Sequence, residues 1–248
     1  EPKDPPVIRG GGVCVQMSDV SHLELHDLVF TGGTGNGLNI DDGGSYETPS
    51  HQLLLRNVVV RAVGRRGTED GIKPSGVDDF RLESCAVERW GRGGSAVDMV
   101  GCHRGVFEGC IFRDLEEKAA ANGVQTKGGS SEIVVRRSRF EHAGDRAVNI
   151  GGSTGLAYFR PKPPGYEAKD ITVEGCVFIG SQAPVAFVGV DGATVRFNTF
   201  YRPRRWFIRI LQETRGPDFV PSRNGSFTDN IVAYRSGEIS APVNVGPG

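Results

Sequence analysis

Asn122-Gly-Val-Gln-Thr-Lys-Gly-Gly129 is the stretch that decides the fold, because its pattern recurs along the chain. An apolar residue, a variable residue and a second apolar residue come in order, and a glycine usually follows. This period of two predicts a short β-strand, and the glycine predicts the turn after it. The clearer copies lie at 37–43, 71–76, 96–101 and 147–152, and weaker ones lie at 185–189, 207–211 and 242–246.

A second pattern, eight residues long, follows the first along the chain, and its copies align without gaps. Unrelated strands would not keep phenylalanine or valine at one position in every copy. The residues at that last position are Phe30, Val60, Val87, Phe112, Phe140, Phe178, Phe200 and Val232. Equivalent residues in the clearest consecutive copies are 24 to 27 apart. That is the length of one coil of a parallel β-helix, whose coils stack about 4.8 Å apart.

The coil pattern resembles the right-handed parallel β-helix proteins of the pectate-lyase-like superfamily, from about Val13 to Val245. We therefore expect an all-β fold, in which residues 1–248 form one solenoid domain of about eight coils. Residues 1–12 are expected to be a polar leading segment. The last copy, at 242–246, has no second pattern after it, which suggests truncation at the C-terminal end. The apolar residues expected to stack inside include Leu38, Ile72, Val97, Val124 and Val148.

Composition argues against several classes of protein. The net charge of −1 gives no basic footprint for nucleic acid, and no apolar run is long enough to span a membrane. Five cysteines match no zinc-binding spacing. Three of them fall in one inward column, where we expect buried free thiols rather than disulfides. This column contains Cys85, Cys110, Ser138, Cys176, Asn198 and Asn230.

Three long connectors join the first pattern to the second, at 41–52, 151–170 and 211–224. All three leave from the same corner of the coil, so we expect them to project from one edge of the solenoid. Long insertions gathered on one edge are typical of a binding face. Two of these connectors carry aromatic and basic residues, namely Tyr46, Tyr158, Phe159, Arg160, Lys162 and Tyr166.

Outward-facing residues of the first strand form two predicted columns. The first contains Cys14, Asn39, Lys73, Asp98, Gln125, Asn149, Phe187, Arg209 and Asn244. The second contains Asp41, Ser75, Val100, Lys127, Gly151, Gly189 and Leu211. Amides and charges beside aromatic loops suit a hydroxylated, anionic polymer. The plainer interpretation is a solvated face, in which Lys73 and Asp98 form a surface ion pair worth less than about 1 kcal/mol.

Many members of the superfamily that this chain resembles cleave acidic polysaccharides by β-elimination. This reaction needs a base and a group that stabilises the enolate-like charge. We expect Lys127 to be the base, because no carboxylate lies beside it in its column. Lys73, with Asp98 one coil away, is expected to stabilise the charge. The predicted substrate-binding residues are Asn39, Gln125, Asn149, Arg209, Tyr158, Phe159, Arg160 and Tyr166.

Three alternatives stay open. Asp41, Asp42 and Asp98 are candidate ligands for Ca²⁺, since this cation binds carboxylate and amide oxygens. Asp41 and Asp98, two coils or about 10 Å apart, also suit an inverting glycoside hydrolase. No Gly-His-Gly motif occurs, however, and no histidine falls in either column. The third alternative is a non-catalytic β-helix module that binds glycans or has a structural role. The resemblance implies an extracellular or periplasmic location.

Overall fold

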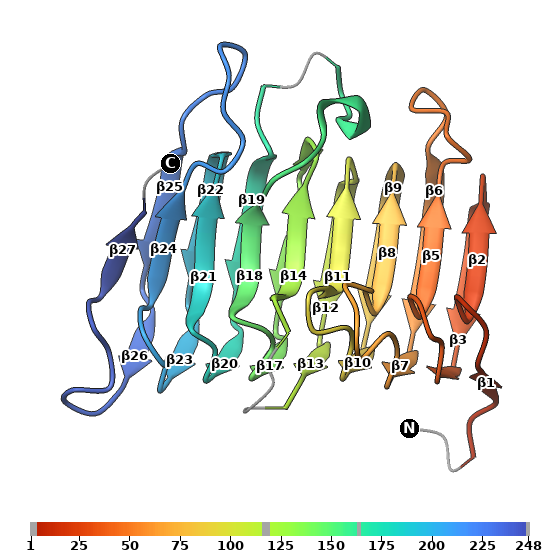
Figure 1. Ribbon diagram of the computed structural model, residues 1–248, viewed down its shortest axis with the longest axis horizontal. Helices are drawn as coiled ribbons and strands as arrows, with labels where there is room; N and C mark the ends of the chain where they lie inside the picture. The colour runs from red at the N-terminus through yellow and green to blue at the C-terminus, as the bar shows by residue number, and fades with distance from the viewer. Residues whose placement is uncertain (1–3, 116–119, 163–164, 247–248) are drawn as a thin grey trace.

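The computed structural model describes residues 4–115, 120–162 and 165–246. Within these residues the chain winds into three parallel sheets, A, B and C, and each coil adds one rung to the stack (Figure 1). Sheet A contains β1 (Val7–Arg9), β4 (Val29–Thr31), β7 (Val59–Arg61), β10 (Ala86–Glu88), β13 (Ile111–Arg113), β17 (Arg139–Glu141), β20 (Val177–Ile179), β23 (Thr199–Tyr201) and β26 (Ile231–Ala233).

Sheet B contains the strands predicted from the first pattern. They are β2 (Val15–Ser18), β5 (Leu38–Asp41), β8 (Ile72–Ser75), β11 (Ser95–Val100), β14 (Asn122–Lys127), β18 (Arg146–Gly151), β21 (Ala183–Val188), β24 (Ile208–Leu211) and β27 (Val243–Val245). Sheet C contains β3 (Ser21–His26), β6 (Ser50–Arg56), β9 (Val77–Glu83), β12 (His103–Glu108), β15 (Ser130–Ser131), β16 (Val134–Arg136), β19 (Ala168–Glu174), β22 (Val190–Arg196) and β25 (Arg223–Thr228). A short 3₁₀ helix, η2, spans Leu156–Tyr158.

The predicted β-helix is confirmed, and its core is a set of ladders that run through the coils. Leu38, Ile72, Val97, Val124 and Val148 are partners in successive rungs of sheet B, and all are buried. The predicted phenylalanine column is a second ladder, in sheet A. Its rings from Phe112 to Phe200 stack with centroids 4.6 to 4.8 Å apart. The rung spacing of a parallel sheet is therefore also the stacking distance of these rings.

The eight-residue second pattern is two strands rather than one. In each coil the last strand of sheet C is followed by a corner residue in the left-handed conformation, for example Asn57 at φ 54° and Ser84 at φ 52°, and one more residue precedes the strand of sheet A. The cysteine column follows directly after this corner. The thiol of Cys85 donates to the carbonyl of Leu55 in the preceding coil, and Cys110 donates likewise to Leu82. Burial raises the pKa of the Cys176 thiol to about 12, and all five cysteines are free.

Several predicted positions were wrong by a small shift. Gln16, and not Cys14, pairs with Asn39 in the outward column. Ala186, and not Phe187, pairs with Asn149, because the bulky phenylalanine packs into the core. The same one-residue shift makes Val188, and not Gly189, the partner of Gly151 in the second column.

The two ends of the solenoid also differ from expectation. Residues 1–12 are not only a leading segment, since Val7–Arg9 form β1 and pair with β4. Sheets A and B each hold nine strands in the described part of the chain, where about eight coils were expected.

Candidate functional site

Three long loops rise from the same edge of the solenoid, as the connector lengths predict (Figure 1). They follow β5, β18 and β24, and we name them the first, second and third loops, at 42–49, 152–167 and 212–222. Elsewhere on this edge the turn is as short as one glycine, such as Gly76 at φ 64°. The side chain of Asp42 leaves no room there for a Cβ atom.

Arg160 joins the first and second loops to sheet C. Its Nε donates to the carbonyl of Tyr46 at 3.0 Å, and its two Nη atoms reach the Asp78 carboxylate at 2.6 and 2.8 Å. The ammonium of Lys162 lies 4.5 Å from the centroid of the Tyr46 ring. Burial alone would raise the pKa of Asp78, but hydrogen bonds from Arg160 and Arg104 hold it below its usual value. The fork geometry of arginine therefore fixes one loop against the other.

Glu167 joins the second and third loops in the same way. Its carboxylate is fully buried and accepts from the backbone N–H of Gly128 and of Thr154, both at 2.9 Å. The hydroxyls of Thr154 and Thr214 donate to the same carboxylate. A buried carboxylate is stable only with such a full set of donors.

A pocket of about 470 Å³ lies between the first and second loops, over the outward face of sheet B. Its floor comes from β5, β8, β11 and β14, and its walls come from the two loops. Predicted residues that line it are Asp41, Asp42, Lys73, Lys127, Tyr158 and Arg160. Tyr46, from the first loop, lines it too. The structure thus brings together the two lysines with the aromatic and carboxylate groups of the adjoining loops.

Asp98 lies between the two lysines and contacts both. Lys73 Nζ pairs with its Oδ2, and Lys127 Nζ lies 3.1 Å from its Oδ1. The expectation that Lys127 has no carboxylate neighbour was therefore wrong. Its column neighbour is Val100, but the long side chain reaches across to Asp98, which occupies the other column of the preceding coil. An ion-paired lysine is a poor base, because the carboxylate favours the ammonium form.

Asp70 completes this network, and the sequence did not single it out. Its Oδ2 lies 3.3 Å from Lys73 Nζ, and its Oδ1 accepts from the backbone N–H of Ser95. Burial and the nearby charge of Asp98 raise the pKa of Asp70 to about 6, against the opposing effect of Lys73. Burial alone would lower the pKa of Lys73, but Asp98 and Asp70 raise it overall. Asp70 stands just before a strand copy, so the alternation gave no signal for it.

Three predicted substrate-binding residues do not line the pocket because they are buried and engaged within the protein. Asn149 is 0% exposed, and its Nδ2 donates to the carbonyl of Gly151. Gln125 is 7% exposed and accepts from Asn122 and Ser95. The ring of Phe159 is fully buried, 5.2 Å from that of Phe219.

Three further predicted substrate-binding residues, Asn39, Tyr166 and Arg209, also lie outside the pocket lining. Asn39 is half-buried and accepts from Asn36 at 2.7 Å. The ring of Tyr166 lies 5.9 Å from Lys169 Nζ, outside the pocket lining. Arg209 lies three rungs beyond Lys127, on β24.

The carboxylates proposed for Ca²⁺ do not form a common site. Asp98 is paired with lysines, Asp42 accepts from the backbone of Gly44, and Asp41 accepts from Gln16 at 2.6 Å. Among residues 4–115, 120–162 and 165–246, no group of three His, Cys, Asp or Glu side chains is placed to hold a metal ion. The residues therefore do not fit the cation, and we derive no step through it.

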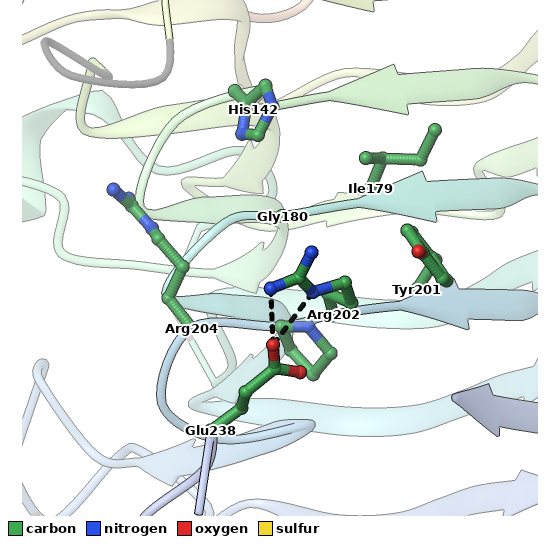
Figure 2. A pocket seen from close by; sticks show the side chains of 8 residues that line it. His142, Ile179, Gly180, Tyr201, Arg202, Arg204 and Glu238 are labelled. Carbon is green, nitrogen blue, oxygen red and sulfur yellow. Dashed lines mark hydrogen bonds and ion pairs between the residues drawn. The ribbon is translucent and has the colours of Figure 1, made fainter. Parts of the chain in front are cut away.

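A second cavity, of about 410 Å³, lies where strands β20 and β23 of sheet A end (Figure 2). Figure 2 shows Arg202 and Glu238 directed at each other, and hydrogen bonds from Nε and Nη2 of Arg202 join them. Arg204 also lines this cavity and pairs with Asp145 at 3.2 Å. These polar groups satisfy one another, so the sheet B pocket is the stronger candidate.

Comparison with known proteins places the fold in a family. The family model described as "Right handed beta helix region" matches residues 12–200, so the chain belongs to this family. No curated protein sequence gives a significant match. Among the described residues, no helix is long and apolar enough to cross a membrane.

Solved structures with a similar fold include proteins named as an alginate lyase and an α-1,3-glucanase. An alginate lyase from Paenibacillus sp. str. FPU-7 is similar at a TM-score of 0.68 and 14% identity, with 98% of this chain and 80% of that chain covered. The Agl-KA catalytic domain gives 0.62 at 12% identity, with 92% and 47% covered. The catalytic domain of a GH87 α-1,3-glucanase gives 0.58 at 11% identity, with 93% and 46% covered. At such identities the likeness shows the fold alone.

Proposed function

We propose that this chain binds an acidic polysaccharide in the sheet B pocket and cleaves it by β-elimination. The observation that carries the proposal is the convergence of Lys73 and Lys127 on the pocket floor, held by the buried Asp98. Two ammonium groups at fixed positions are suited to bind a uronate carboxylate and to stabilise the charge that develops on it. An extracellular or periplasmic location, where such polymers occur, is part of the proposal.

The roles of the residues follow from their surroundings. Lys73 and Lys127 neutralise the substrate carboxylate, and Asp98 holds both side chains in place before substrate arrives. Because both lysines are ion-paired, we assign the role of base to Tyr158 instead of Lys127. Tyr158 lines the pocket and is 62% exposed. As general base, its side-chain oxygen takes the proton from the carbon α to the carboxylate. The electron pair forms the double bond, the glycosidic oxygen leaves, and the new phenol returns the proton to that oxygen.

The alternative of an inverting hydrolase has less support in the geometry. A general acid must exchange its proton with the glycosidic oxygen, and a general base must reach a water molecule. Asp98 is 3% exposed and shared by two lysines. It is therefore engaged by both ammonium groups and has little access to substrate.

A panel of polysaccharides tests the proposal. Alginate, polygalacturonate, hyaluronan and a neutral α-1,3-glucan are incubated with the protein. Ultraviolet absorbance of unsaturated products and new reducing ends are then measured in parallel. We expect both signals with one acidic polymer and neither with the neutral glucan. Reducing ends without absorbance would show hydrolysis, and binding without either signal would show a non-catalytic module.

Tyr158→Phe separates the proposed base from a binding role. This variant keeps the aromatic ring and loses only the hydroxyl group. We expect kcat to fall by about 10²–10⁴-fold with little change in KM, as for the loss of a general base. Full activity in Tyr158→Phe would show that another group takes the proton.

A further inference from the structure

Two arginines lie over the ring of Trp206, which comes just before strand β24 of sheet B and outside the pocket lining. The guanidinium carbons of Arg205 and Arg209 lie 4.2 and 4.8 Å from the centroid of its ring. Trp206 is only 7% exposed, so the arginines and their surroundings cover its ring. A guanidinium stacked on an aromatic ring keeps its N–H groups in its own plane, available to an oxyanion. The indole thus holds two planar cations in place.

Arg146, at the start of β18, adds a third cation to this cluster. Burial, Arg146 and Arg205 lower the pKa of Arg209, while Glu213 and Asp145 oppose this effect. Like charges are therefore close enough to repel one another, and a bound anion would relieve that repulsion.

The acids nearby do not balance the three cations. Glu213 pairs with Arg146 at 2.9 Å, and Asp145 pairs with Arg204 at 3.2 Å. Arg209 donates to the neutral amide oxygen of Asn244. In the part of the chain that the structure describes, the Arg205 guanidinium has no carboxylate or carbonyl acceptor. Arg205 and Arg209 thus keep their charge without an acidic partner.

We propose that Arg205 and Arg209, beside the Glu213-paired Arg146, form a second subsite, which binds a carboxylate- or sulfate-bearing sugar of a long acidic glycan. The inference rests on the proposed function, because it extends the substrate beyond the pocket. The strand of Arg209 lies three rungs from that of Lys127 on the same sheet, about 14 Å away. This is the length of a few sugar rings, so one chain can occupy both sites while a disaccharide cannot.

The test compares oligosaccharides of two lengths. Isothermal titration calorimetry measures Kd for di- and octasaccharides of alginate, polygalacturonate and a sulfated glycosaminoglycan, with inorganic sulfate as a free anion. The variant is Arg205→Gln/Arg209→Gln. The control is Arg196→Gln/Arg223→Gln, which removes two arginines from sheet C, one of them also beside an aromatic ring.

We expect the Arg205→Gln/Arg209→Gln variant to weaken octasaccharide binding by about ten- to a hundredfold, as for the loss of charge-assisted hydrogen bonds. Disaccharide binding and the control variant should keep the wild-type Kd. Equal effects on both lengths, no effect on either, no binding to the wild type, or binding of inorganic sulfate alone would overturn the subsite. A wild type that binds octasaccharides through the arginines without cleaving them would contradict only the proposed elimination.

Discussion

Asp98 sets the properties of the pocket floor, because one buried carboxylate serves two lysines. Its contacts with Lys73 and Lys127 restrict two flexible side chains before substrate arrives, so less conformational entropy is lost on binding. A substrate carboxylate then meets ammonium groups that are already in position. Asp70 also contacts Lys73 and accepts from the Ser95 N–H, but its burial and the nearby charge of Asp98 raise its pKa.

Asp70 gives a prediction for stability against pH. Its pKa rises from 3.8 to about 6 on folding, so the folded state holds this proton more tightly than the unfolded state does. The stabilisation is therefore fully present below pH 3.8 and is lost as pH rises through 6. We expect Asp70→Asn to remove this loss, so that its free energy of unfolding falls less between pH 4 and 6. Urea denaturation at several pH values measures it, and identical profiles would show that Asp98 and Lys73 already compensate the charge.

The three loops act as a unit because buried carboxylates join them to their neighbours. Glu167 ties the second loop to the third, and Asp78 holds Arg160, which ties the second loop to the first. Each link crosses many residues of sequence and none follows the coil period. The walls of the pocket therefore depend on a few strong hydrogen bonds to buried carboxylates rather than on the sheet ladders.

Replacing Glu167 by glutamine should loosen the second loop. The amide keeps one acceptor oxygen but places an NH₂ group against existing donors, at a cost of about 1–3 kcal/mol. We expect faster amide hydrogen exchange in the second loop and a higher KM, with the coils unaffected. The control is Glu174→Gln on sheet C, where the carboxylate pairs with Arg196 at the surface. Unchanged exchange in the second loop would mean that Glu167 is not its main anchor.

The whole solenoid was predictable because the same physical demand recurs in every coil. An inward apolar residue such as Val97 must pack against another apolar residue in the next rung. This requirement produces the repeat that is visible in the sequence. The position of the loops was also predictable, because the long connectors interrupt the coil repeat at one corner of the solenoid. Where all residues of a strand are apolar, as around Phe187, alternation carries no register, and the prediction slipped by one residue.

The candidate site was predictable only in part. The columns placed Lys73, Asp98 and Lys127 on one face, but they did not show which side chains the loops would cover. Gln125 and Asn149 are buried, and both amides donate to the Gly151 carbonyl. The link of Arg160 to Asp78 joins residues 82 positions apart, and no periodic signal predicts such a contact.

A charge in the core tests the stacked architecture. Val97 is fully buried between Ile72 and Val124, so Val97→Asp would place a carboxylate where no partner exists. We expect a loss of about 4 kcal/mol or more in the free energy of unfolding, or an insoluble protein. Val97→Ala, which only leaves a cavity, is the milder comparison. A soluble Val97→Asp protein as stable as the wild type would contradict the register of sheet B.

The most direct test of the proposed site is the rate of unsaturated product formation in single lysine variants, once the panel has given an active polymer. Lys73→Ala and Lys127→Ala should each lower kcat/KM by a hundredfold or more, as for other groups that stabilise transition-state charge. Arg56→Ala, which removes an exposed cation from sheet C, should retain the wild-type rate. Full activity in both lysine variants, with activity lost in Arg56→Ala, would show that the site is not on sheet B.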